Sequence, residues 1–171
     1  MRVLVTGSNG YLGRHVVLAL LKRHHHVRAL VRSAERRREV ELLDVFQTYL
    51  DDGLLELKVV TELENVPADV FQGIESVHHV ASPYHYVGTN AQEDYIRPAL
   101  INTIALLKAS IDSNTVQSFI LTSSFAACLS PGDCFYSGKI YTEEVRKIRN
   151  PGKYRDYQLI QLIEFYRTGA V

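Results

Sequence analysis

The sequence predicts an α/β fold in which helices pack on both faces of a parallel sheet. Short apolar runs alternate with longer helical segments, an arrangement typical of strands joined by crossover helices. The first apolar run, at residues 2–5, is followed at once by glycines spaced three apart and then by a helical segment. Hydrophobic residues make up 46% of the 171 residues, which is sufficient for one domain, residues 1–171, with its own core.

Five strands are expected from the short apolar runs, at residues 2–5, 27–31, 54–60, 76–80 and 117–121. Because consecutive parallel strands are joined by right-handed crossovers, these runs predict a Rossmann-type doubly wound sheet with the strand order 3-2-1-4-5. No sixth strand is recognised, so the sheet is expected to be incomplete after the fifth strand.

Four helices are expected between the strands, at residues 14–22, 35–50, 67–72 and 90–113. The helix at 35–50 is predicted to be continuous until Gly53 breaks it. The last helix carries a predicted core stripe, and Pro98 either kinks this helix or marks its effective start. The stripe consists of apolar residues at helical spacing, which are Ile96, Leu100, Ile104 and Leu107.

The glycines after the first strand predict a dinucleotide-binding turn. Gly7 lets the chain turn sharply, Gly10 leaves room for a pyrophosphate beside the backbone, and Gly13 lets the helix pack close to the strand. The N-terminus of that helix offers free N–H groups to phosphates. The predicted cofactor-binding residues of the turn are Thr6, Gly7, Asn9, Gly10, Tyr11, Leu12 and Gly13.

The pattern Thr-Gly-x-x-Gly-x-x-Gly resembles the turn of the extended short-chain dehydrogenase/reductase superfamily. This resemblance implies an NAD(P)-dependent oxidoreductase. The segment His79-Val80-Ala81-Ser82-Pro83 is similar to that of the dihydroflavonol-reductase-like and fungal aldehyde or ketone reductase subfamily, in which Ala81, Ser82 and Pro83 would pack on the cofactor. His78 and His79 are interpreted as ordinary strand residues, and residues 84–86 either shape a substrate pocket or form an aromatic loop.

Arg32 indicates which dinucleotide is preferred. NAD-binding proteins of this kind carry an acidic residue after the second strand, which holds the ribose 2′-hydroxyl. Arg32 stands there instead, and a guanidinium pairs with a 2′-phosphate, so we expect NADP (NADPH) rather than NAD. The cluster Arg36–Arg38 either adds to this attraction or is a solvated helix face. Glu62 and Leu63, after the third strand, are expected beside the adenine.

The resemblance also implies catalytic residues. Ser124 matches the serine that hydrogen-bonds the substrate carbonyl oxygen, and Tyr157 is the best match for the tyrosine that protonates it. The superfamily places lysine four residues after that tyrosine, but Gln161 stands there. The match extends over residues 1–144, and no substrate domain follows. We therefore expect a truncated chain, or one whose predicted gene is incorrect, with weak or no activity.

The composition excludes several other classes of function. Lys plus Arg equals Asp plus Glu, at 19 each, so no net charge favours nucleic acid or a membrane surface. Two cysteines form no disulfide framework, no signal peptide is recognised, and a cytoplasmic protein is expected. His24–His26 are interpreted as a solvated helix end rather than a metal site.

Two alternative functions remain open from the sequence. The chain is either a reductase of small carbonyl substrates or a non-catalytic NADP-binding fragment or redox sensor. A nucleotide-sugar epimerase or dehydratase is disfavoured by Arg32 and by the Ala-Ser-Pro segment.

Overall fold

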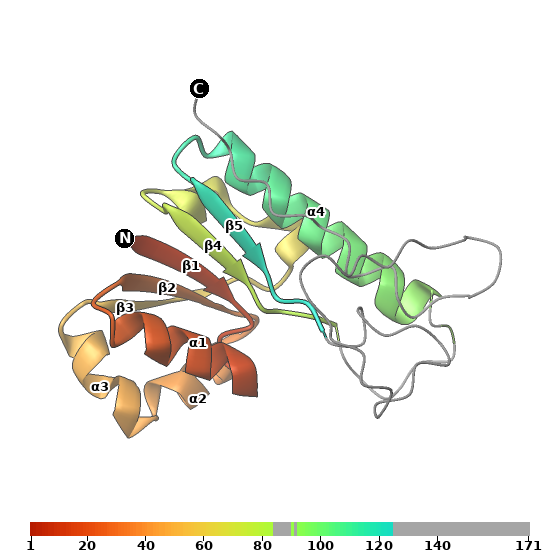
Figure 1. Ribbon diagram of the computed structural model, residues 1–171. Helices are drawn as coiled ribbons and strands as arrows, with labels where there is room; N and C mark the ends of the chain where they lie inside the picture. Colours follow the sequence, from red (N-terminus) through yellow and green to blue (C-terminus); the bar gives the residue numbers. More distant parts are fainter. Residues whose placement is uncertain (84–89, 91, 125–171) are drawn as a thin grey trace, which may run out of the picture.

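One sheet of five parallel strands forms the centre of the computed structural model, which describes residues 1–83, 90 and 92–124 (Figure 1). The strand order is β3-β2-β1-β4-β5, so the predicted class and order are confirmed. In chain order the strands are β1 (Arg2–Thr6), β2 (His26–Val31), β3 (Leu55–Val59), β4 (Ser76–His79) and β5 (Ser118–Leu121). The crossover between β3 and β4 passes from one edge of the first three strands to the opposite side of β1, which creates the switch point typical of this fold.

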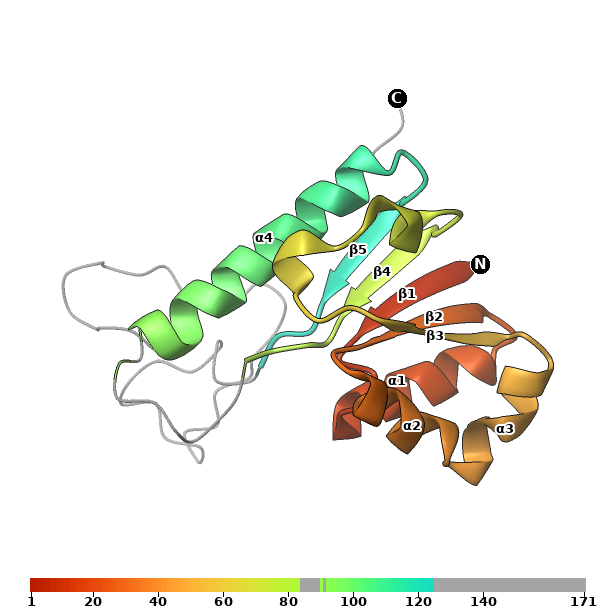
Figure 2. The same cartoon turned by 180° about the vertical axis from the view of Figure 1, so that it is seen from behind.

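Helices cover both faces of the sheet (Figures 1 and 2). One face carries α1 (Tyr11–Leu21), α2 (Ala34–Glu41) and α3 (Asp44–Asp51). The other carries the short helices η1 (Leu63–Asn65) and η2 (Ala68–Phe71) and the long helix α4 (Arg97–Asp112), which the π-helical turn η3 (Gln92–Ile96) precedes. Alternate residues of β1 point to the two faces: Val3 and Val5 lie in the core beneath α1 to α3, and Leu4 lies in the core beneath η2 and α4.

The helix predicted over residues 35–50 is two helices, so that prediction is corrected. The chain leaves α2 at Leu42, and Leu43 is extended before α3 begins at Asp44. In one continuous helix Val40 and Phe46 would lie about 120° apart around the axis. The break allows both side chains to be buried in the same core, where each is 1% exposed.

The face of α4 that meets the sheet also differs from the prediction. Ile96 is buried, but Leu100 and Ile104 are 44% and 38% exposed. The residues that are buried on the helix are Ala99, Thr103, Leu106 and Ser110. Three of these are small, and α4 lies against the short helices η1 and η2 of the β3–β4 crossover. Pro98 lies in the first turn of α4, which fits the interpretation of Pro98 as a helix start.

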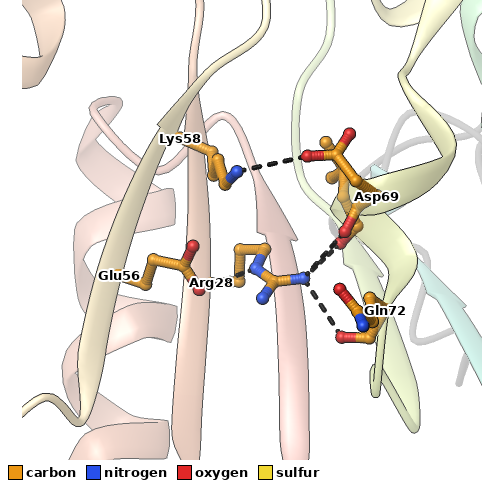
Figure 3. Close-up of polar contacts among 6 residues, drawn as sticks. Arg28, Glu56, Lys58, Asp69 and Gln72 are labelled. Carbon is orange, nitrogen blue, oxygen red and sulfur yellow. Dashed lines mark hydrogen bonds and ion pairs between the residues drawn. The ribbon is translucent and has the colours of Figure 1, made fainter.

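Arg28 is a buried charge that fastens the β3–β4 crossover to the sheet (Figure 3). Its Nε donates to Glu56 Oε2 at 2.8 Å, and its Nη1 donates to the carbonyl oxygens of Val70 at 2.7 Å and Gln72 at 3.2 Å. Val70 lies in the last turn of η2 and Gln72 is its C-cap, so Arg28 supplies a donor to two carbonyls at the end of this short helix. This crossover positions the end of β3 at the edge of the cleft described below.

Candidate cofactor-binding site

The turn between β1 and α1 has the geometry that its glycines predict. Gly7 has a φ of +67°, and a Cβ atom there would lie 2.8 Å from the backbone of Ala81. A Cβ on Gly13 would lie 2.0 Å from the Gly7 carbonyl oxygen, so α1 packs directly against the turn. A Cβ on Gly10, in contrast, would meet only the Gly7 oxygen, at 3.2 Å. Gly10 is exposed, and its missing side chain leaves open space in front of the backbone.

The N-terminus of α1 is suited to an anion. Gly10 is its N-cap, no side chain caps it, and its first turn contains no acidic residue among the positions Tyr11 to Arg14. Its first N–H groups and the positive end of the helix dipole therefore lack a side-chain partner. A pyrophosphate fits this arrangement, because the space that a Cβ on Gly10 would fill lies directly beside these groups.

Arg32 follows β2 and is exposed. Among the residues that the structure describes, its side chain has no hydrogen bond or ion pair. Its neighbours differ: Arg36 donates to Glu39 at 2.6 and 2.9 Å, and Arg37 donates to Glu41 at 2.6 Å. Arg36 and Arg37 are thus engaged along α2, whereas the Arg32 guanidinium remains available to a ligand.

The ends of β3 and β4 supply two further walls. Glu62 is exposed and is the N-cap of η1, and Leu63 is the first residue of that helix. Ala81, Ser82 and Pro83 follow β4 and line the cleft described next, and Ala81 lies against Gly7 of the glycine turn. The wall formed by Ala81, Ser82 and Pro83 is called the β4 wall below.

A cleft of about 960 Å³ joins these features along the carboxyl ends of the strands. Of the predicted cofactor residues, all but Thr6 line it, and Thr6 is fully buried behind the glycine turn. Arg32 and Glu62 stand over β2 and β3, while Ser124 lines the cleft after β5. Tyr157, Tyr84, His85 and Tyr86 lie outside the described residues.

Other residues line this cleft that sequence reasoning did not select. They include His79 on β4 and Asn102 and Thr103 on α4. The sequence indicates only an ordinary strand residue at His79. Asn102 and Thr103 are not part of the apolar stripe predicted for this helix, and Thr103 belongs to the face that is buried instead. The only sequence signal was the position of His79 at the end of a strand, where cofactor sites lie in such sheets.

Neither a cluster of metal ligands nor a membrane-spanning helix is found in the described part of the chain. Its residues contain no group of three or more His, Cys, Asp or Glu side chains placed to hold a metal ion. None of its helices has both the length and the apolar character needed to cross a membrane.

The fold and the cleft define a doubly wound dinucleotide-binding domain. Residues 3–151 match the model of the NAD dependent epimerase/dehydratase family. The chain belongs to this family, which lies within the extended short-chain dehydrogenase/reductase superfamily and comprises NAD(P)-dependent enzymes.

Individual relatives are similar over most of the chain. Dihydroflavonol 4-reductase of Arabidopsis thaliana is 33% identical over 124 residues, which are 71% of this chain and 32% of that protein. Aldehyde reductase 2 of Sporidiobolus salmonicolor is 31% identical over 135 residues, or 75% and 37% of the two chains. The chain therefore spans less than half the length of these relatives.

A solved structure shows the same fold. Yeast methylglyoxal/isovaleraldehyde reductase Gre2, complexed with NADPH, superimposes with a TM-score of 0.62 at 28% identity. The superposition covers 74% of this chain and 38% of that one. Membership of the superfamily, predicted from the glycine turn and the Ala-Ser-Pro segment, is confirmed.

Proposed function

We propose that the chain is an NADP-dependent oxidoreductase domain, which takes part in hydride transfer between NADPH and a small carbonyl or alcohol substrate. The cofactor supplies or accepts the hydride, and the protein positions it. The family assignment and the reductase names of the relatives support this proposal.

The observation that carries the proposal is the environment of Arg32. It lines the cleft at the end of β2, where an NAD-specific site needs a carboxylate, and it is not engaged by the ion pairs that hold Arg36 and Arg37. An exposed guanidinium in this position attracts a 2′-phosphate and offers it paired N–H donors.

The remaining lining residues divide the cleft into two halves. The glycine turn and the N-terminus of α1 hold the pyrophosphate in the middle. Glu62 and Leu63 border the adenosine half beyond β2, and the β4 wall borders the nicotinamide half toward β5. Ser124 stands at the substrate end, where its hydroxyl donates to the carbonyl oxygen and stabilises negative charge that develops there.

Tyr157 is proposed as the proton donor to that oxygen. A lysine four residues later would lie on the same helix face and lower the tyrosine pKa through its charge. Gln161 is neutral and cannot do so, and general acid–base assistance is typically worth about 10²–10⁴-fold in rate. We therefore expect this chain by itself to turn over substrate poorly.

Cofactor preference is tested by titrating the purified full chain with NADPH and with NADH. Wild type is expected to bind NADPH at least about tenfold more tightly, and Arg32→Glu to remove or reverse this preference. Arg38→Glu is the matched control, because Arg38 is also exposed but lies on α2 and does not line the cleft. Equal wild-type affinities for the two cofactors would contradict the proposal.

Activity is tested by following NADPH oxidation with a panel of aldehydes and ketones. Slow turnover that Ser124→Ala abolishes would support the reductase. Binding of NADPH with no turnover would instead favour the alternative of a non-catalytic NADP-binding domain. Gln161→Lys is expected to recover only part of the rate. Wild-type turnover at about 1–10³ per second would contradict the expectation of weak activity.

A further inference from the structure

His79 is the centre of a buried chain of side-chain hydrogen bonds. Its Nδ1 lies 2.7 Å from Thr6 Oγ1, at the end of β1, and its Nε2 lies 3.1 Å from Thr103 Oγ1, on α4. His79, Thr6 and Thr103 are 2%, 0% and 5% exposed. These bonds connect β4, β1 and α4, which are far apart in the sequence. His79 and Thr103 reach the wall of the cleft, and Thr6 lies behind the glycine turn.

The geometry determines which ring nitrogen carries the proton. Thr103 Oγ1 lies 2.7 Å from the carbonyl oxygen of Ala99. A carbonyl can only accept, so the Thr103 hydroxyl donates to it and accepts from His79. Nε2 therefore bears the hydrogen, and in a neutral ring Nδ1 is left as an acceptor. Thr6 donates its hydroxyl hydrogen to Nδ1.

The direction of this chain leaves both lone pairs of Thr6 Oγ1 available. They accept the backbone N–H groups of Val80, at 3.2 Å, and Ala81, at 3.1 Å. Every donor and acceptor in the series is thus satisfied. Ala81 is the first residue of the β4 wall, and its backbone is so close to Gly7 that no Cβ fits between them.

We propose that His79 is a positioning residue for the nicotinamide half of the cofactor: its neutral Nε2–H form orients Thr6, and Thr6 holds the β4 wall against the glycine turn. This inference rests on the proposed function. His79 acts through Thr6 and is not a catalytic residue. Since the adenosine half lies over β2 and β3, the hydrogen-bond chain affects one half of the cleft and leaves the other half unchanged.

Because only one half of the cleft should be affected, ligand binding can distinguish a positioning role of His79 from a general loss of stability. Two ligands are titrated against each variant of the full chain: NADPH, which occupies both halves, and adenosine 2′,5′-bisphosphate, which lacks the nicotinamide half. Thr6→Val removes the acceptor of the two bonds that reach the β4 wall, and His79→Phe removes the Nδ1 acceptor that orients the Thr6 hydroxyl. Each is expected to weaken NADPH binding about tenfold and to leave the binding of adenosine 2′,5′-bisphosphate within about twofold.

Two further variants keep the test valid if His79→Phe does not fold. His79→Asn can retain an acceptor toward Thr6, so it is expected to restore most of the affinity for NADPH. Thr103→Val removes the bond between His79 and α4, together with the bond from Thr103 to the Ala99 carbonyl, and leaves the bond between His79 and Thr6; it is expected to have an intermediate effect. Ser110→Ala is the matched control, because Ser110 is also buried on α4 and donates to the carbonyl four residues earlier, but it does not line the cleft.

The double variant Thr6→Val/His79→Phe is expected to bind NADPH about as tightly as whichever single variant has the lower affinity. His79 acts through Thr6, so the two losses should not add. Equal losses for both ligands, or no loss for NADPH, would overturn the inference while leaving the proposed function intact. A wild-type chain that binds neither ligand would refute the proposed function and this inference with it.

Discussion

Gly13 and Gly7 are in such close contact that a Cβ on Gly13 would lie 2.0 Å from the Gly7 carbonyl oxygen. The approach of α1 to β1 thus depends on a missing side chain. We predict that Gly13→Ala destabilises the domain by about 3 kcal/mol, because the backbone of the turn must move to admit one methyl group. Urea unfolding of the purified chain measures this change.

Gly53→Ala is the control for that measurement. Gly53, unlike the helical Gly13, has a positive φ, of +69°, but a Cβ there would meet nothing within 4 Å. Its substitution is expected to cost only about 1 kcal/mol of backbone strain. Similar losses for the two variants would show that α1 does not pack against the turn as closely as described.

Gly10→Val is predicted to separate folding from binding. The nearest atom to its Cβ is the Gly7 oxygen, at 3.2 Å, so the domain should fold with only a modest loss of stability. The branched side chain would fill the space beside the N-terminus of α1, and we expect NADPH binding to weaken by at least about 100-fold. Retained binding, measured by calorimetry, would mean that the turn does not hold the pyrophosphate.

The stability of the domain is predicted to fall below neutral pH because of His79. Burial lowers the pKa of this imidazole to about 4, whereas an unfolded histidine titrates near 6.5. The unfolded chain therefore binds the proton first, and the contribution of the neutral ring, complete above pH 6.5, is lost as the pH falls toward 4. About 2 kcal/mol should be lost between pH 7 and pH 5.

Urea unfolding at pH 7 and pH 5 tests this pH dependence, with His79→Asn as the comparison. Burial also lowers the pKa of His78, so both proteins should lose some stability for that reason. The wild type is expected to lose about 2 kcal/mol more than the variant. Parallel changes in the two proteins would show that His79 is not the group responsible.

Arg28 is predicted to matter more than the carboxylate with which it pairs. Arg28→Met leaves the carbonyls of Val70 and Gln72 without their donor and should cost about 2–3 kcal/mol. Glu56→Gln should cost less than about 1 kcal/mol, since the Glu56 side chain is 46% exposed and water can replace its partner. Chemical denaturation of both variants would contradict this account if the two losses were equal.

Local signals in the sequence were enough to predict the sheet and the dinucleotide turn. Each strand is a short apolar run, and the handedness of crossovers restricts how such runs can be ordered. The roles of Gly7 and Gly13 follow from their places between a strand and a helix, because backbone conformation and close approach are fixed within a few residues.

Tertiary structure alone decided the features that depend on distant parts of the chain. The break at Leu43 and the buried face of α4 follow from which side chains fill the two cores, and periodicity alone does not specify this. The partners of His79 are 73 residues away at Thr6 and 24 residues away at Thr103. A hydrogen bond forms only where the fold brings donor and acceptor together. The residues around His79 therefore predict a strand but do not identify its partners.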